Sequence, residues 1–295
     1  FANAFAPVFT PSASLIKTIN NNLSVYASYG MGYAPPTLSQ RTTSNGKVDT
    51  TLKPETAVEY EIGTKGSIGN NKQFSYQLTL FDMDITNRLT LEYANTDSYY
   101  TNVGEERNLG AEVYASYDVI NNQSSFLSFL RPFVSLTYSD FTYVKYNNYT
   151  KSKAGNDSSL ANYTNNKVAE VSPLVYNIGV DVATKIGIYL NATYRYVDKA
   201  PVTFDNYHYM SAYSLLSAKI GYKHAIGKHF VADIFVGGDN LLGSTYYNFI
   251  FVGQNIQELA QGNDPYIKNG GGDGYILPAP YKATFYGGLS LKYRF

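Results

Sequence analysis

Residues 285–295 read FYGGLSLKYRF and carry the plainest structural pattern in the chain. Counting from Phe285, every second residue is apolar, aromatic or glycine, whereas the residues between them include Ser290, Lys292 and Arg294. Successive side chains of a β-strand point to opposite sides, so this alternation predicts a strand with one apolar face and one polar face. The first face is suited to lipid and the second is not.

The same alternation recurs along the chain and predicts an all-β protein. Nine further stretches show it, and a weaker one lies near residues 5–19, which makes about eleven strands in total. No stretch shows the period of about 3.6 residues that marks an amphipathic helix. The nine stretches are residues 23–29, 58–63, 74–80, 109–118, 134–139, 176–182, 188–195, 216–223 and 230–236.

The connections between these stretches alternate in length. Short turns are expected at residues 18–22, 67–72, 121–125, 183–187 and 225–228. Long links are expected at residues 34–55, 86–106, 147–170, 198–211 and 241–282. Short turns on one side and long loops on the other are typical of outer-membrane barrels, which place the turns in the periplasm and the loops outside the cell.

The composition excludes several other classes of protein. Lys and Arg together number 23, as do Asp and Glu, so there is no basic excess for nucleic-acid binding. Cysteine is absent, which excludes disulfides and thiolate metal sites. No run approaches the roughly 18 apolar residues of a transmembrane helix. The low share of charged residues (16%) and the 30 tyrosines fit a transmembrane β-barrel.

A soluble β-sandwich would show similar alternation, but two observations favour the barrel. The expected strands, at about ten to fourteen residues, are longer than the usual strand of about five or six. Tyrosines also gather near strand ends, as at Tyr26, Tyr29 and Tyr33 and again at Tyr194 and Tyr196. Aromatic girdles at membrane interfaces have this distribution. We therefore predict a transmembrane antiparallel β-barrel.

Five segments, taken in order, resemble the TonB-dependent outer-membrane receptors over essentially the whole chain. They are LSVYASYGMGYAPPTLSQ at 23–40, LKPETAVEYEIGTKG at 52–66, the G-x-E of Gly110–Glu112, DNLLGSTYY at 239–247 and the terminal LKYRF. The second resembles the family segment L-x-P-E-x-x-x-x-x-E-x-G. The last resembles the terminal aromatic strand, whose final Phe, here Phe295, is read by the barrel-assembly machinery.

The resemblance implies a plugged barrel of about 22 strands, of which residues 1–295 supply the C-terminal part. The plug domain, the TonB box and the first half of the barrel are expected outside this chain. A half-barrel would leave two open strand edges in lipid, where unpaired backbone groups are not tolerated. We therefore expect either a truncated piece of a receptor or one part of a split receptor whose partner closes the wall.

Ten charged residues fall on the face that the alternation assigns to the interior. A charge that faces lipid at mid-depth costs about 2–4 kcal/mol, which explains their sorting onto one face. They serve either as solvated lumen residues and wall-to-wall ion pairs or, as the resemblance implies, as contacts to the plug. The ten are Glu59, Glu61, Lys65, Glu112, Asp118, Lys219, Lys223, Asp233, Lys292 and Arg294.

Ligand capture is expected in the long loops. Aromatic rings stack on flat ligands, and Arg pairs with the anionic groups of an iron chelate; the alternative is that these residues belong to an ordinary girdle or a solvated loop. The long link 241–282 is predicted to be a functional lid. The candidates are Arg41, Tyr99, Tyr100, Arg107, Tyr207, His208, Tyr209, Tyr246, Tyr247 and Phe249.

The sequence contains no catalytic constellation. His208, His224 and His229 lack zinc-ligand spacing, and the GGGDG at 270–274 has no strand-to-helix context that would make it a phosphate-binding loop. We expect no enzyme activity, no metal site and no cofactor.

The resemblance implies active uptake of a bulky, scarce nutrient across the outer membrane of a Gram-negative bacterium. Ferric siderophore is the expected cargo, and cobalamin, haem or an oligosaccharide are alternatives within the family. A passive porin and a structural component of an envelope complex are alternatives from other classes. The expected partners are outer-membrane lipid, the plug domain and remaining strands, the TonB complex acting through the plug, and the barrel-assembly machinery, but not nucleic acid.

Overall fold

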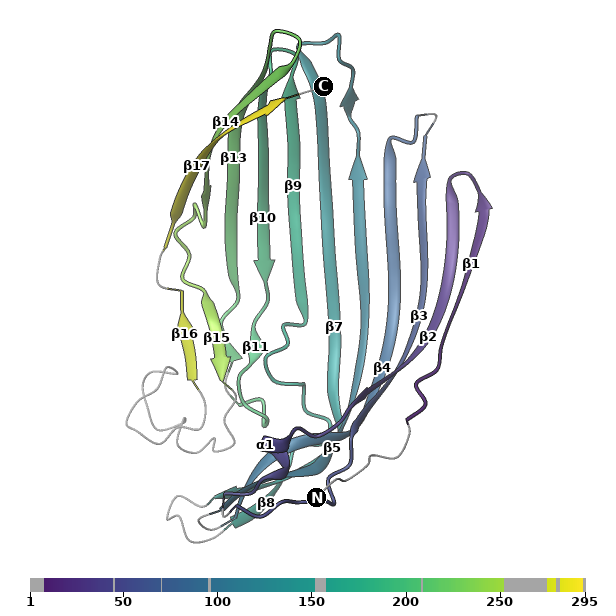
Figure 1. Ribbon diagram of the computed structural model, residues 1–295, viewed down its shortest axis with the longest axis vertical. Helices are drawn as coiled ribbons and strands as arrows, with labels where there is room; N and C mark the ends of the chain where they lie inside the picture. Colours follow the sequence, from purple (N-terminus) through teal and green to yellow (C-terminus); the bar gives the residue numbers. More distant parts are fainter. Residues whose placement is uncertain are drawn as a thin grey trace.

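The computed structural model describes residues 8–44, 46–69, 71–94, 97–151, 158–207, 209–251, 275–279 and 282–293. These residues form one tall, curved antiparallel sheet with loops and small hairpins gathered at one end (Figure 1). Short turns such as 21–22, 185–187 and 227–229 lie at the other end. We call these the loop end and the turn end. No helix in the described part of the chain is long and apolar enough to cross a membrane.

Eleven strands pair in the order in which they follow one another along the chain, which confirms the predicted antiparallel architecture and strand number. They are β1 (Ser12–Asn20), β2 (Leu23–Ala34), β3 (Glu55–Ile68), β4 (Phe74–Ala94), β5 (Asp97–Tyr117), β7 (Leu127–Lys151), β9 (Leu174–Thr184), β10 (Ile188–Val197), β13 (Tyr213–Ile226), β14 (Phe230–Asp239) and β17 (Thr284–Tyr293).

The remaining elements are short. Strands β6 (Ile120–Asn121) and β8 (Ser158–Asn162) pair with β7 outside the main path. Strand β11 (Ala200–Pro201) pairs with β12 (Tyr209–Met210), and β15 (Tyr247–Phe251) pairs with β16 (Tyr275–Pro278). The one-turn helix α1 (Leu38–Arg41) starts at a capping box, in which the Gln40 N–H donates to Thr37 Oγ1 and the Thr37 N–H donates to Gln40 Oε1.

Four of the expected long loops contain strands, among them 198–211, which includes β11 and β12. Residues 86–106 are almost entirely the continuing strands β4 and β5, each 21 residues long, and β7 runs for 25 residues. The link 241–282 includes the β15–β16 hairpin. The alternation is interrupted between Ile85 and Arg88, where the β4–β5 register shifts. Because a bulge resets which face a side chain occupies, a strict two-residue period fails to detect the continuing strand.

One turn requires glycine at a defined position. Gly187, between β9 and β10, has a φ of +98°. A Cβ atom there would lie 2.1 Å from the backbone oxygen of Lys223 on the neighbouring strand β13. Only glycine accommodates both the left-handed backbone and this approach.

The register keeps two different faces continuous across the sheet. Directly paired residues of antiparallel strands lie on the same side. One row of pairs runs from Ile62 through Leu80 and Ala111 to Tyr138, and another runs through Gln77, Tyr114, Ser135 and Asn177. We call the side of the first row the apolar face and the side of the second row the polar face.

The apolar face is uncovered over most of its area. On β17 alone, the exposed fractions of Phe285, Leu289 and Leu291 are 78%, 76% and 62%. Such a continuous exposed apolar surface is far larger than soluble monomers tolerate and marks contact with lipid or protein. Apolar residues are buried in clusters only at the loop end, around Val197 and around Tyr143, within the described ranges.

Candidate functional site

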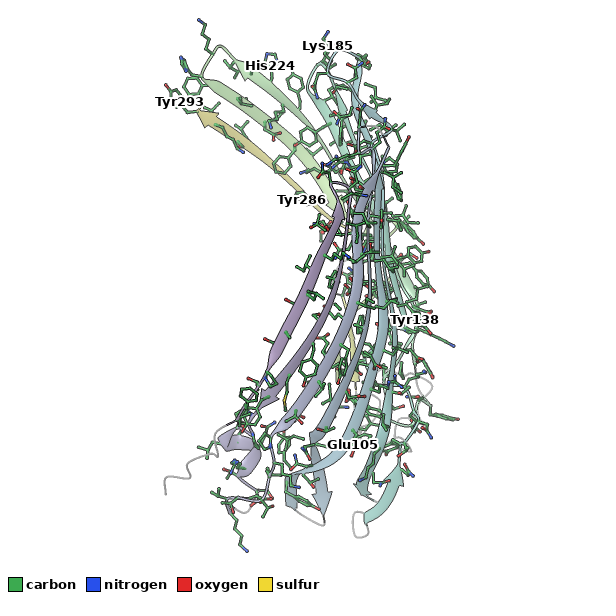
Figure 2. The ribbon with its side chains drawn as sticks, turned by 90° about the vertical axis from the view of Figure 1, so that its right-hand side faces the viewer. Glu105, Tyr138, Lys185, His224, Tyr286 and Tyr293 are labelled. Carbon is green, nitrogen blue, oxygen red and sulfur yellow. The ribbon has the colours of Figure 1, made fainter. Side chains whose placement is uncertain are left out.

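The charged residues predicted to face the interior share the polar face wherever they are described. Figure 2 shows the sheet from the side, with side chains projecting from both faces. The register places Glu59, Glu61, Lys65, Glu112, Lys219, Lys223, Asp233 and Lys292 on the polar face, and Asp118 reaches it from just beyond β5. Arg294 and Phe295 lie outside the described residues.

Three of these charges are held by the wall itself. Ser28 Oγ donates a hydrogen bond to Glu61 at 3.1 Å, and Tyr189 Oη donates one to Asp233 at 2.9 Å. Asp118 accepts two hydrogen bonds from the guanidinium of Arg131 on β7. These contacts fix the three carboxylates in place within the sheet.

Six other charges form no ion pair with another residue in the described part of the chain. Among them, the Lys219 ammonium lies 5.6 Å from the ring centres of both Tyr189 and Phe235. A charge left unpaired in a filled interior is costly, so these groups must face either water or a protein partner of complementary charge. The six are Glu59, Lys65, Glu112, Lys219, Lys223 and Lys292.

Aromatic rings on the polar face lie directly over glycines of the next strand. Gly63 is covered by the Tyr26 ring, whose hydroxyl reaches Thr79 Oγ1 on β4 at 2.7 Å. The ring of Tyr189 covers Gly221 in the same way and reaches Asp233 on β14. Each side chain thus spans three consecutive strands, and we call this arrangement a brace. Rings also cover glycines at Phe81/Gly110, Phe133/Gly179, Phe235/Gly288 and Tyr286/Gly237.

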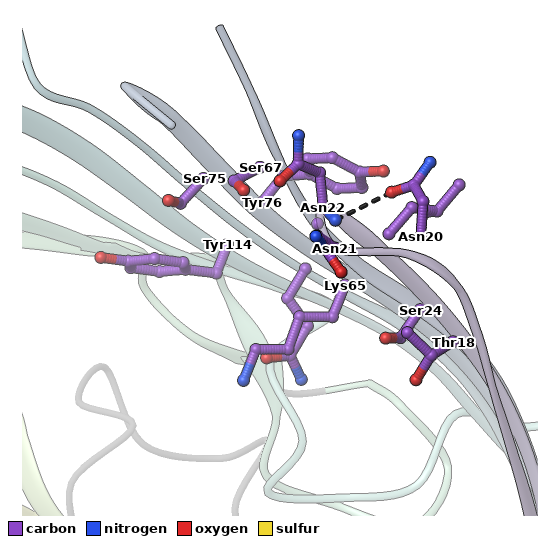
Figure 3. A pocket seen from close by; sticks show the side chains of 13 residues that line it. Thr18, Asn20, Asn21, Asn22, Ser24, Lys65, Ser67, Ser75, Tyr76 and Tyr114 are labelled. Carbon is purple, nitrogen blue, oxygen red and sulfur yellow. Dashed lines mark hydrogen bonds between the residues drawn. The ribbon is translucent and has the colours of Figure 1, made fainter. Parts of the chain in front are cut away.

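A polar hollow lies near the turn end of β1 to β5. It measures about 530 Å³, and its lining is drawn in Figure 3. Asparagine, serine and threonine side chains make up most of the wall, together with Gln77, Tyr76 and Tyr114. Lys65 is the only charged residue among them. The hollow therefore offers neutral hydrogen-bonding groups around one ammonium, which suits a polypeptide segment that carries a carboxylate.

At the loop end, the outer segments are tied together by a buried aromatic cluster. Tyr143 and Tyr146 of β7 are completely or almost completely buried, with ring centres 4.6 Å apart. Tyr163 packs against Tyr146, and Phe204 packs against all three tyrosines. Burial raises the pKa of Tyr163 to about 12. The cluster joins β7 to the segments that precede β9 and follow β10.

A buried ion pair adjoins this cluster. Arg88 of β4 pairs with Glu106 of β5, and its guanidinium carbon lies 5.4 Å from the centre of the Tyr143 ring. Burial raises the pKa of Glu106, although the charge of Arg88 opposes the shift. Asn206 bonds both the backbone N–H and the carbonyl of Lys167. These contacts connect β4, β5 and β7 to one another, and residue 167 to residue 206, within the described part of the loop end.

The residues predicted to capture ligand are dispersed at the loop end. Arg41 ends α1, and Tyr99 and Tyr100 lie in the long hairpin formed by β4 and β5. Tyr207 is 69% exposed, and the Lys199 ammonium lies 5.2 Å from the ring centre of Tyr209.

Four more of these predicted residues lie in or near the 241–282 link or beyond the described ranges. The Tyr246 ring centre is 5.6 Å from that of Tyr213. Tyr247 and Phe249 lie in β15, but their side chains are outside the described part. His208 is also outside the described residues.

Arg107 was expected among the ligand-capturing residues of the outer loops, but it lies in strand β5. The register pairs Arg107 with Thr142 and places it on the same side as Leu109, which is the apolar face. Its guanidinium donates two hydrogen bonds to Asp82, at 2.9 and 2.6 Å. Since Arg107 points away from the polar face and is already paired, we leave it out of the candidate ligand surface.

The structure adds residues that sequence reasoning did not single out. Arg88 and Glu106 fall in the stretch predicted to be a loop, so nothing marked them as a buried pair. Arg195 alternates with apolar residues in 188–195, and this pattern already assigned it to the polar face. Tyr213, on the neighbouring strand β13, lies two residue pairs closer to the loop end than Arg195. The described residues contain no group of three or more His, Cys, Asp or Glu side chains that could hold a metal ion.

An antiparallel sheet with one exposed apolar face, one charged face and long loops at one end has the features of a segment of an outer-membrane barrel wall. Residues 3–241 match the family described as TonB dependent receptor-like, beta-barrel. The chain belongs to the TonB-dependent receptor family and supplies part of its barrel. Members of this family are transport receptors of the outer membrane rather than enzymes.

Solved structures of receptors share this fold. The siderophore receptor PiuA from Acinetobacter baumannii is 17% identical, with a TM-score of 0.68, and the match covers 95% of this chain and 35% of PiuA. The ferric-catecholate import receptor Fiu from E. coli K12 is 18% identical, with a TM-score of 0.60 and coverage of 96% and 34%. The copper transporter OprC is 15% identical, with a TM-score of 0.62 and coverage of 96% and 40%. This chain therefore spans well under half the length of these relatives.

Proposed function

We propose that this chain forms the C-terminal part of the barrel of an outer-membrane transporter that imports a ferric siderophore. In this proposal the apolar face contacts lipid, the polar face surrounds a plug domain, and the loop end faces the outside of the cell. The remaining strands come from the same protein or from a partner chain. Cobalamin, haem, another metal complex or an oligosaccharide are alternative cargoes of the same transport class.

The observation that carries the proposal is the separation of charge between the faces. Six charges on the polar face have no ionic partner within the described wall, while the apolar face exposes residues such as Phe285 and Leu289. Charges that face inward are expected if the interior is filled by a polar domain, which can pair with them. The hollow around Lys65 is a site where such a domain would dock.

The loop end supports the choice of cargo. Exposed Tyr207 and the Lys199–Tyr209 pair offer rings and a cation to an arriving ligand. Aromatic rings and cations suit flat, anionic iron chelates. Two of the structural relatives described above are named as receptors for siderophores or ferric catecholates. On this basis we place siderophores ahead of the other cargoes.

Energised transport through the TonB complex is part of the proposal and can be tested in cells. The complete protein would be expressed in a Gram-negative strain that lacks its own siderophore receptors and is starved of iron. Growth restored by one class of ferric siderophore, and lost when TonB is deleted, is the expected result. Uptake that persists without TonB, together with a steady open conductance of the complete protein in planar bilayers, would instead identify a passive pore.

A further inference from the structure

One arginine on the polar face lies apart from the other charges. Arg195 pairs in register with Asn177 of β9 and Leu215 of β13, two residues before β10 ends at the loop end. It is exposed, and it forms no ion pair with another residue in the described ranges. Lys219 lies nearer the turn end, paired with Asn191, four residues back along β10.

The polar face around Arg195 is neutral. On β7, β9, β10 and β13, the polar-face residues beside it and nearer the loop end carry hydroxyl, amide or apolar groups. Hence none of these four strands supplies a carboxylate to the guanidinium; the next carboxylate on the polar face is that of Asp239, on β14, and it forms no ion pair with Arg195. The neutral polar residues are Ser135, Thr137, Asn177, Thr193 and Ser217.

An apolar cluster covers the loop-end side of Arg195. Val197, Ala200, Val202 and Met210 are buried together where the segment after β10 folds back onto the sheet. The ring of Tyr213 packs against this cluster and lies 5.6 Å from the ring of Tyr246.

Tyr213 pairs with Val197, two residues along β10 from Arg195, so Arg195 and Tyr213 are diagonal neighbours on the polar face. The two rings and the apolar cluster thus lie toward the loop end from Arg195, which is itself exposed on the polar face.

This surrounding strengthens the attraction of Arg195 for an anion. A low-dielectric neighbour reduces screening, so a charge pair formed beside it is stronger than one in open water. The planar guanidinium can donate two parallel hydrogen bonds to a carboxylate or to paired phenolate oxygens. The guanidinium of Arg195 forms no ion pair with another described residue of the sheet.

We propose that Arg195 and the Tyr213–Tyr246 ring pair form an anion-binding site for the transported chelate. The cargo presents a carboxylate or catecholate oxygen to the guanidinium and a flat face to the two rings. This inference rests on the proposed function and deepens it, because it assigns the cargo to anionic iron chelates rather than to neutral chelates or sugars.

The test measures binding by the complete receptor in detergent, using equilibrium dialysis with radioactive iron. The probes are a ferric tricatecholate, ferric citrate and a neutral ferric trihydroxamate. Arg195→Gln should weaken binding of the anionic chelate that the wild type binds by about 10- to 100-fold, the range for a hydrogen bond to a charged group. The affinity of Arg195→Lys should lie between those of the wild type and Arg195→Gln, because lysine keeps the positive charge but cannot donate two parallel hydrogen bonds. A higher salt concentration should reduce the difference in affinity between the wild type and Arg195→Gln, because it screens the charge.

Controls separate a loss of ligand contact from a loss of structure. Lys185→Gln removes one positive charge from the turn between β9 and β10, at the opposite end of the sheet, and should leave affinity unchanged. The gel mobility of unheated samples verifies that each variant folds.

Two results would overturn the inference. The first is unchanged affinity of Arg195→Gln for a chelate that the wild type binds; if the unfolding temperature of this variant without ligand is also lower, the guanidinium instead pairs with a carboxylate of the plug domain. The second is a wild-type preference for the neutral chelate. A wild-type receptor that binds none of the three chelates would overturn the proposed function as well, so the two failures are distinguishable.

Discussion

The brace at Gly63 should make this glycine irreplaceable even by alanine. A Cβ atom on Gly63 would lie 2.3, 2.4 and 2.6 Å from Cε1, Cζ and Oη of Tyr26. All three atoms belong to one side chain, so the ring must leave its position. In doing so it gives up its hydrogen bond to Thr79 Oγ1, a residue that is 4% exposed.

The expected cost follows from three contributions. Loss of the hydrogen bond costs about 0.5–1.5 kcal/mol, and overpacking a well-packed site costs about 1–3 kcal/mol. Replacing glycine in a strand returns about 0.5–1 kcal/mol of backbone entropy. Gly63→Ala should therefore lower the free energy of unfolding by about 1–3 kcal/mol.

The assay is urea unfolding of the complete barrel in lipid vesicles, followed by far-UV circular dichroism. Gly30→Ala is the matched control: it lies on the polar face of β2, and no atom lies within 4 Å of the position that its Cβ would occupy. In a Tyr26→Ala background, Gly63→Ala should cost almost nothing, which gives a coupling of about 0.5–3 kcal/mol in the double-mutant cycle. Equal losses for Gly30→Ala and Gly63→Ala, or additive effects in the cycle, would refute the reasoning.

Three further predictions follow from the faces, the loop end and the turns. Leu289→Arg should cost about 2–4 kcal/mol and block insertion into vesicles, while Ser290→Arg, on the opposite face of β17, should insert normally; equal insertion would contradict the lipid assignment. Glu106→Ala should loosen the loop end by about 3–5 kcal/mol because it leaves Arg88 buried without its partner, seen as faster proteolysis of the outer segments, whereas Arg88→Met/Glu106→Leu should remain protease-resistant. Gly187→Ala should destabilise the barrel by at least about 1 kcal/mol in urea unfolding, since its φ is +98°, and a neutral effect would show that the turn can rearrange.

The sequence was sufficient to predict the strands that have two unlike faces. Over residues 216–222 of β13 and throughout β17, every second residue is apolar, aromatic or glycine, and the structure pairs these strands through β14 as the order along the chain requires. The same alternation placed Lys219 and Lys292 on the polar face. Two-residue periodicity is a local property of a strand, so it can be detected without knowing which strands are neighbours.

The extended ends of β4, β5 and β7 were not predicted, because beyond the apolar band nothing forces one face to be apolar. Arg107 shows the consequence: it lies on the apolar face, paired with Asp82, where alternation alone suggested a loop residue available to ligand. The residue-by-residue register between paired strands could not be predicted from the sequence either, since it depends on how far each strand is shifted along its neighbour. For that reason the Asp118–Arg131 pair could not be derived from the sequence. The roles of Tyr207 and Tyr209 in ligand capture remain predictions.

The braces give the wall a mechanical property that backbone pairing alone does not supply. Sliding one strand by a residue against its neighbour would turn every side chain to the wrong side, and it would also drag the Tyr26 or Tyr189 ring off its glycine and away from the third strand. Because each brace spans three strands, sliding between one pair of strands is also opposed by the contact with the third strand. If this wall closes around a plug domain as proposed, such braces would keep the diameter of the barrel constant while force is applied to the plug.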